Sequence, residues 1–197
     1  MLPNLVLASS SPWRRQVLDK LGLPYRGKHP DIDETPLLAE APADLVARLA
    51  LEKAQAIAPT FKDALVIGSD QVAVLEGQII GKPGTHARAR RQLQMAAGRT
   101  LSFLTGLCLL NTTTGRAQRA VVPYHVHFRP LSEELIEGYL QQEQPYDCAG
   151  SFKSEAGGIV LVERLEGDDP NALIGLPLIR LVRMLEQEGV NPFQVSA

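Results

Sequence analysis

The chain has 197 residues, of which 45% are hydrophobic, and its formal net charge is −2. This apolar content supports a packed core rather than disorder, and the nearly balanced charge argues against a nucleic-acid binder, which is usually markedly basic. The sequence has two cysteines, too few for a disulfide framework, and it shows no signal-peptide pattern. It also lacks the apolar run of about 20 residues that a membrane span needs. We therefore expect a cytoplasmic protein with no nucleic-acid or membrane partner.

The amino-terminal pattern predicts a short buried strand followed by a capped helix. Residues 5–8 are a short apolar run, as in a buried strand. Three serines and a proline follow, and a serine cap with proline in the first turn is typical of a helix start. We expect a helix over residues 13–21, ended by Gly22, and then a polar, proline-rich strand end and loop over residues 24–42.

The middle of the chain predicts an alternation of helices and strands. A helix is expected over about 43–58, and a buried strand over 64–68 that delivers Ser69, Asp70 and Gln71 at its carboxyl end. Two apolar runs flanking Glu76 and Gly77 predict a hairpin over residues 72–80. A helix is then expected over about 85–97.

The last third predicts two long strands and two more helices. The two long strands are expected over 100–110 and 119–129, with a turn between them. A helix over 132–142 and a strand over 158–164 are expected next. A loop that begins at residue 170 then leads to the last helix, over 176–188. Strands and helices are mixed without strict alternation. The chain is therefore predicted to be an α/β protein with a mixed sheet.

Serines and arginines around the first helix start predict an anion site. A helix amino terminus offers free N–H groups and a partial positive charge. Ser9 adds a hydroxyl, and Arg14 and Arg15 add planar guanidinium groups that match phosphate oxygens. An ordinary capped helix with two surface arginines would have the same residues at these positions. Both interpretations therefore stay open from this segment alone.

Acidic and basic residues elsewhere extend the predicted site. Ligands of open α/β sheets collect beyond the carboxyl ends of strands, where Asp70 is expected, and a carboxylate there can hold Mg²⁺ or activate water. Glu34 is the second acidic candidate, whereas Asp33 beside it fits a capping role. Lys53 and Lys82 could each reach a phosphate as a point charge. No glycine-rich phosphate loop, dinucleotide fingerprint or serine-hydrolase elbow is present.

Seven short segments, in order along nearly the whole chain, resemble motifs of the Maf family of nucleotide pyrophosphatases. They are Leu7–Arg15, Asp33–Thr35, Glu52–Ala54, Gly68–Gln71, Gly81–Pro83, Gly150–Glu155 and Gly175–Pro177. The resemblance implies an elongated mixed β-sheet flanked by helices, with two lobes around a cleft, similar to inosine triphosphate pyrophosphatases. It also implies a single domain over residues 1–197 and allows a homodimer.

The resemblance further implies a reaction and roles for the candidate residues. Family members cleave a nucleoside triphosphate between the α and β phosphates with a divalent metal cation, Mg²⁺ or Mn²⁺. Glu34 and Asp70 are then expected to hold the metal, with Asp70 also the general base on the attacking water. The expected phosphate-binding residues are Ser9, Arg14, Arg15, Lys53 and Lys82.

Three departures from the common family pattern resemble the subgroup that hydrolyses 7-methyl-GTP to 7-methyl-GMP and pyrophosphate. They are Trp13, Gln71 and Glu155. An indole face can stack on the positively charged ring of a methylated guanine, and a carboxylate can accept hydrogen bonds from the guanine N1–H and amino group. Two alternatives remain, which are a dTTP/UTP pyrophosphatase and a nucleotide-binding regulator of cell division.

Overall fold

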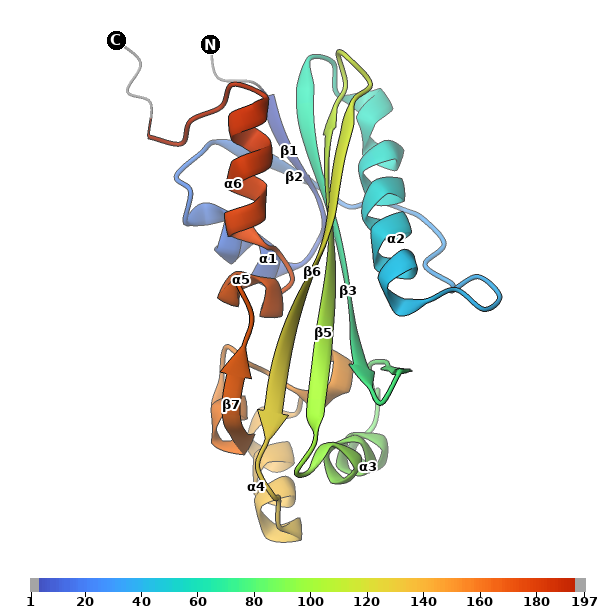
Figure 1. Cartoon of the computed structure of the whole chain (residues 1–197), viewed down its shortest axis with the longest axis vertical. Coiled ribbons are helices and arrows are strands. Elements are labelled where there is room, and N and C mark those ends of the chain that lie inside the picture. Colours follow the sequence, from blue (N-terminus) through green and yellow to red (C-terminus); the bar gives the residue numbers. More distant parts are fainter. Residues whose placement is uncertain (1–3, 194–197) are drawn as a thin grey trace. The chain divides into compact units, whose positions relative to one another are not determined.

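The computed structural model describes residues 4–193, and a seven-stranded mixed sheet with helices lies within them (Figure 1). The strand order is β2 (Tyr25–Lys28), β1 (Asn4–Ala8), β3 (Ala64–Leu75), β5 (Thr100–Asn111), β6 (Ala117–Phe128) and β7 (Val162–Glu166), and β4 (Gln78–Ile80) pairs with β3 off this path. The β1–β2 and β1–β3 pairs are parallel, whereas β3–β4 and β6–β7 are antiparallel. This confirms the predicted α/β class with a mixed sheet. No helix among residues 4–193 is long and apolar enough to cross a bilayer.

The chain divides into two compact units, and three strands contribute residues to both. These shared strands are β3 (Ala64–Leu75), β5 (Thr100–Asn111) and β6 (Ala117–Phe128). Within the described residues, unit 1 comprises 4–71, 105–122 and 169–193, and unit 2 comprises 72–104 and 123–168.

Unit 1 is a sheet with helices on both faces. Its elements are β1 (Asn4–Ala8), α1 (Pro12–Asp19), β2 (Tyr25–Lys28), α2 (Pro42–Ile57), the 3₁₀ turn η1 (Ala58–Thr60), α5 (Pro170–Leu173) and α6 (Leu178–Gln187). Leu5 and Leu7 pack with α1 and α6 on one face, whereas Val6 and Ala8 pack with α2 on the other. Successive side chains of a strand point to opposite faces, and both faces of this parallel region are covered. The continuous apolar run at 5–8 follows from this burial.

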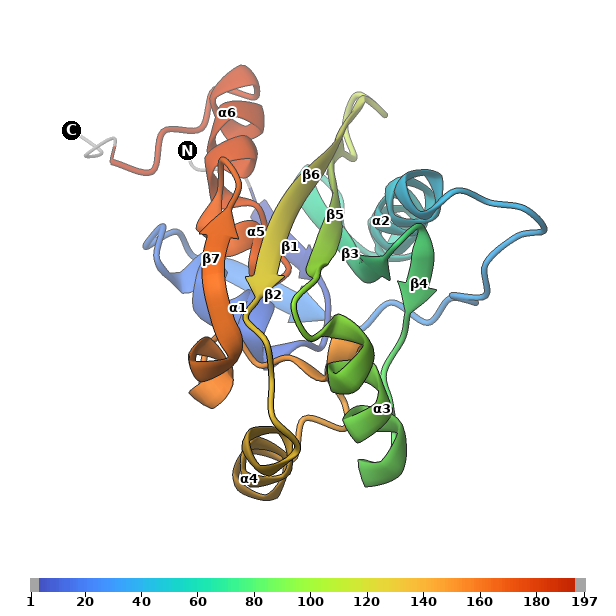
Figure 2. The ribbon, with the colours of Figure 1, turned by 60° about the horizontal axis from the view of Figure 1, so that its bottom comes forward.

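Unit 2 contains β4 (Gln78–Ile80), α3 (His86–Ala96), α4 (Glu133–Glu143), the 3₁₀ turns η2 (Ala149–Ser151) and η3 (Gly157–Leu161), and β7 (Val162–Glu166). Helices α3 and α4 are in contact, as Figure 2 also shows. Phe152 packs against Phe103 and Phe128, with ring centroids 6.1 and 5.4 Å apart. The predicted hairpin is confirmed, and its turn residues Glu76 and Gly77 have φ values of 50° and 83°.

The predicted helix starts are confirmed in their details. Ser11 caps α1 by accepting a hydrogen bond from the Arg14 amide, with Pro12 in the first turn. Helix α1 ends at Asp19, two residues earlier than expected, and Gly22 lies beyond the turn that follows, with a φ of 63° that a glycine adopts without steric cost. Thr85 and Ser132 cap α3 and α4 in the same way.

Three further expectations were wrong by more than two residues or in the type of element. The strand expected over 64–68 continues to Leu75, because its later residues pair with β4. The first part of the strand expected over 158–164 is η3, and the Gly158 amide there donates a turn hydrogen bond to the Lys153 carbonyl oxygen at 3.1 Å. The loop expected at Pro170 is the short helix α5, which Asp169 caps through the Asn171 amide.

Candidate active site

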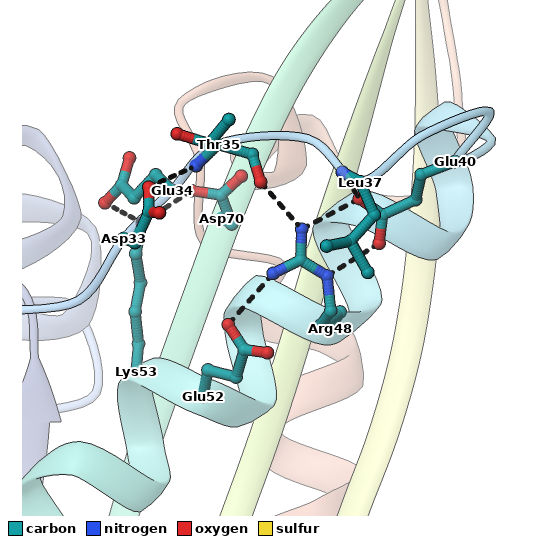
Figure 3. A network of polar contacts seen from close by, with 9 residues as sticks. All are labelled: Asp33, Glu34, Thr35, Leu37, Glu40, Arg48, Glu52, Lys53 and Asp70. Atoms are coloured by element: carbon teal, nitrogen blue, oxygen red, sulfur yellow. Dashed lines mark hydrogen bonds and ion pairs between the residues drawn. The ribbon is translucent and has the colours of Figure 1, made fainter.

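A lysine and two carboxylates meet within unit 1 (Figure 3). The Lys53 Nζ of α2 lies 2.6 Å from Asp70 Oδ1 and 2.7 Å from Glu34 Oε1. Lys53 is 4% exposed and Asp70 is 7% exposed, whereas the Glu34 side chain is about half exposed. One ammonium group thus bridges two carboxylates that would otherwise repel each other.

The sequence brings Lys53 and Asp70 together through a close approach of α2 to β3. A Cβ on Gly68 would lie 2.0 Å from the Ala50 carbonyl oxygen, so only glycine allows this spacing. Asp70 lies within β3, and not beyond its carboxyl end as the sequence predicted. The polar side chain is tolerated in mid-strand because Lys53 satisfies it.

The start of α1 lies in the same unit and supplies two further predicted residues. Ser9 is buried, and its hydroxyl accepts a hydrogen bond from the Ser11 amide at 3.1 Å. The half-buried Arg14 donates from Nε to the Gly175 carbonyl oxygen at 2.8 Å. Desolvation lowers the pKa of Arg14, while the charges of Asp70 and Glu34 act in the opposite direction. Arg14 therefore shares the electrostatic environment of the acidic pair.

Ser69 and Gln71, the neighbours of Asp70, hold the segment before α6. The Ser69 hydroxyl lies 2.9 Å from the Gly175 carbonyl oxygen, the same atom that Arg14 contacts. The Gln71 Nε2 donates to Thr105 Oγ1 and to the Ala172 carbonyl oxygen, at 2.9 and 2.8 Å. The Gln71 amide nitrogen thus has a structural role, and its predicted part in substrate selection stays a prediction.

Other predicted residues are exposed. Trp13 is 39% exposed on α1, and the exposed Arg15 places its guanidinium against Gly27 of β2. Lys82 and Glu155 are exposed in unit 2, where Glu155 accepts a hydrogen bond from the Ser154 hydroxyl. Unit 1 therefore joins Glu34, Lys53 and Asp70 directly, and the roles of these exposed residues stay predictions.

Two residues with clear roles in this region, Arg48 and Glu40, are absent from the sequence-based prediction, and Gly175 stands in it only as part of a family motif. Arg48 and Glu40 form an ion pair beside the segment that carries Glu34, and the Gly175 carbonyl receives both Arg14 and Ser69. Arg48 and Glu52 stand four residues apart on α2, a spacing that predicts a helical ion pair. No sequence signal points to a carbonyl acceptor at position 175.

Comparison with known proteins decides the family. Residues 4–188 match the family described as Maf-like protein. The chain belongs to the Maf family. It is 60% identical over 187 residues to a protein of Nitrosococcus oceani named 7-methyl-GTP pyrophosphatase, and the match covers 95% of this chain and 94% of that relative.

The donor set of this Maf protein fits the divalent metal that the family resemblance implies. Glu34 and Asp70 already share one cation, the Lys53 ammonium. Among residues 4–193 no group of three or more histidine, cysteine, aspartate or glutamate side chains is arranged to hold a metal. Mg²⁺ is usually bound by one or two carboxylates together with substrate phosphates. The pair Glu34 and Asp70 matches that pattern once a triphosphate contributes the remaining oxygens.

Proposed function

We propose that this protein is a nucleoside triphosphate pyrophosphatase that hydrolyses 7-methyl-GTP to 7-methyl-GMP and pyrophosphate. The observation that carries the proposal is the 60% identity, over nearly the full length of both chains, to a relative with that name. The cluster of Glu34, Lys53 and Asp70 supports it, because it combines acidic and basic groups suited to a metal-bound triphosphate.

In the proposed reaction, Asp70 takes a proton from water as the water oxygen bonds to the α phosphorus. The bond from that phosphorus to the bridging oxygen breaks, and pyrophosphate leaves with the electron pair. Lys53 donates to Oδ1 of Asp70, so we assign Oδ2 to the water proton. This is general base catalysis by a carboxylate held in a fixed orientation.

The charged side chains are proposed to stabilise the leaving pyrophosphate. Arg14 provides a planar donor, and Lys53 and Lys82 provide point charges. Ser9 and Arg15 add donors near the start of α1. A divalent cation, Mg²⁺ or Mn²⁺, held by Glu34 and Asp70, would supply charge neutralisation on the phosphates.

Selection of the base is proposed to rest on Trp13, Gln71 and Glu155. The exposed indole of Trp13 offers a face for the positively charged 7-methylguanine ring. The Glu155 carboxylate can accept from the N1–H and amino groups of guanine. A pyrimidine offers neither the charge nor that pair of donors. A homodimer, a cytoplasmic location and a single domain also remain predictions.

A substrate panel tests the proposed function. Pyrophosphate release from 7-methyl-GTP, GTP, dTTP and UTP is measured with Mg²⁺ and with a chelator, and the highest kcat/KM is expected for 7-methyl-GTP with Mg²⁺. In ¹⁸O-labelled water, attack at the α phosphorus places the label in 7-methyl-GMP. A preference for dTTP and UTP would replace the proposal with the pyrimidine alternative. Tight nucleotide binding without pyrophosphate release would favour the regulator.

A further inference from the structure

The segment that carries Glu34 has little apolar support. It connects β2 to α2, and residues 33–39 are all exposed and lie outside helices and strands. Leu37 and Leu38 in this segment point outward, with exposures of 60% and 102%. Hydrophobic burial therefore does not fix the place of Glu34, and polar contacts must do so.

Arg48 of α2 makes those contacts (Figure 3). Its Nε and Nη2 donate to the two carboxylate oxygens of Glu40, at 2.7 and 2.8 Å. Its Nη2 also donates to the Thr35 carbonyl oxygen at 3.2 Å, and its Nη1 donates to Glu52 at 3.0 Å. One guanidinium thus ties both ends of the segment 35–40 to the helix.

The Glu40 carboxylate completes the connection. It accepts a hydrogen bond from the Leu37 amide at 2.9 Å, in addition to its two bonds from Arg48. These hydrogen bonds, that from Arg48 above all, lower the pKa of Glu40 to about 2. Glu40 is therefore ionised at neutral pH and stays paired with Arg48.

Arg48 holds the residue that follows Glu34. Thr35, whose carbonyl Arg48 holds, follows Glu34 directly, and the Thr35 amide donates to Asp33 at 2.9 Å. The same helix presents Lys53 to the Glu34 carboxylate at 2.7 Å. Helix α2 thus fixes the backbone after Glu34 through Arg48, and it contacts the Glu34 side chain through Lys53.

We propose that Arg48 is a positioning residue that sets the place of Glu34 opposite Asp70, which the metal role of Glu34 requires. This inference rests on the proposed function. The geometry needs a planar fork, because a lysine has a single ammonium group and cannot pair with both carboxylate oxygens of Glu40 while reaching Thr35. The interactions that orient a metal ligand typically change metal affinity about 10- to 100-fold when they are removed.

The test compares Arg48→Lys and Arg48→Ala with the unchanged chain. Amide hydrogen exchange of the protein alone, without metal or nucleotide, should be about tenfold faster or more at Thr35 and Leu37 in both variants, as expected for lost charge-assisted hydrogen bonds. The Mg²⁺ concentration for half-maximal pyrophosphate release should rise about tenfold or more. Turnover at saturating Mg²⁺ should recover, since Arg48 is proposed to act only through the position of Glu34.

Arg183→Ala is the matched control, because Arg183 forms its ion pair with Glu186 of its own helix α6. It should leave both the exchange of residues 33–40 and the Mg²⁺ midpoint unchanged. Unchanged exchange and midpoint in the Arg48 variants would overturn the inference. If the unchanged chain releases no pyrophosphate, the proposed function fails, while the exchange measurement still decides whether Arg48 holds the segment. Arg48→Lys keeps the test decisive if Arg48→Ala does not fold.

Discussion

The pair of Lys53 and Asp70 combines two charges that are almost completely buried. Removing charges from water is costly, and their attraction often only offsets that cost, so a buried ion pair is weak evidence for stability. Two apolar residues would satisfy the same packing between α2 and β3. The burial of this pair therefore supports the proposed reaction site, in which the carboxylate of Asp70 must be held in one orientation.

Asp70→Asn tests the role of that carboxylate. The amide is nearly the same size but cannot accept a proton from water, so turnover of 7-methyl-GTP should fall at least about a hundredfold. Pyrophosphate release at saturating nucleotide and Mg²⁺ measures the change. Far-ultraviolet circular dichroism shows whether the variant is folded, since the substitution also removes one of the two negative charges that contact Lys53. Turnover close to that of the unchanged chain would contradict the assignment of Asp70 as general base.

Trp13 and Glu155 carry the predicted choice of base. In the double variant Trp13→Arg, Glu155→Gln, the preference for 7-methyl-GTP over GTP should fall about tenfold or more, because the indole face that attracts the charged ring is lost. Use of dTTP and UTP should rise. Trp13→Phe is the control, as it keeps an aromatic face at the same position. An unchanged ranking of the four nucleotides in the double variant would remove both residues from the selectivity argument.

At the scale of elements, α2 is the part that assembles the site. It packs against β3 at Gly68 and against β5 at Gly106, where an added Cβ would lie 2.0 Å from a helix carbonyl oxygen in each case. Its side chains Arg48 and Lys53 then act on the segment that carries Glu34. The position of the helix on the sheet therefore determines the geometry of the acidic cluster.

Gly68→Ala tests this close approach. The added methyl group must push α2 away from β3, and overpacking of this kind typically costs about 1–3 kcal/mol. Urea unfolding measures the loss. Gly138→Ala in α4 is the matched control, since nothing lies within 4 Å of its Cβ position, and alanine inside a helix is favoured by about 0.5–1 kcal/mol over glycine. Equal effects of the two substitutions would show that the approach at Gly68 is not tight.

The segment between β2 and α2 should depend on pH through Glu40. Its pKa falls from an ordinary 4.5 to about 2 in the folded chain, chiefly because Arg48 donates to it. A lowered pKa stabilises the folded chain above the ordinary value, and the stabilisation is lost as the pH falls from 4.5 toward 2. Glu40→Gln should therefore destabilise the protein at neutral pH, and the difference from the unchanged chain should shrink over that window.

Urea unfolding of the unchanged chain and of Glu40→Gln at several pH values measures this difference. Glu163→Gln is the control, because Glu163 is an exposed glutamate of β7. Its effect should be small and nearly constant with pH. A difference for Glu40→Gln that stays constant below pH 4.5 would contradict the pairing of Glu40 with Arg48.

Local signals in the sequence predicted the starts of α1, α3 and α4, because a capping side chain and its helix are neighbours in the chain. They failed for β3, which runs without a break through Asp70 to the residues that pair with β4. They also failed for Arg48. Its acceptors include Thr35, thirteen residues away along the chain, and such a contact exists only after the segment has folded onto α2.

At the scale of the whole molecule, the class of fold was predictable from the sequence patterns, and the family resemblance implied two lobes, but the boundaries of the two units were not predictable. Mixed strand and helix patterns indicated a mixed sheet, which the strand order confirms. The boundaries of the units, however, fall inside β3, β5 and β6. No composition shift or linker marks such a boundary, because the strands continue through it. The two units are defined by contacts between residues, and not by linkers or turns along the chain.

Because the two units share three strands, we expect them to unfold together. The prediction of a single domain over residues 1–197 requires the same behaviour. Neither unit can lose its share of β3, β5 and β6 without disturbing strands that continue into the other. The two cysteines report the units separately, with Cys108 in unit 1 and Cys148 in unit 2. Burial raises the pKa of Cys108 to about 11 and that of Cys148 to about 12, so both thiols should react slowly until they are exposed.

Pulses of iodoacetamide at increasing urea concentration, followed by peptide mass spectrometry, measure the exposure of each thiol. The midpoints for Cys108 and Cys148 should coincide with each other and with the fluorescence transition of Trp13, the one tryptophan of the sequence. Coincident transitions from independent probes are the mark of two-state unfolding. Separate midpoints would mean that one unit keeps its packing after the other has unfolded, and the chain would then behave as two domains despite the strands they share.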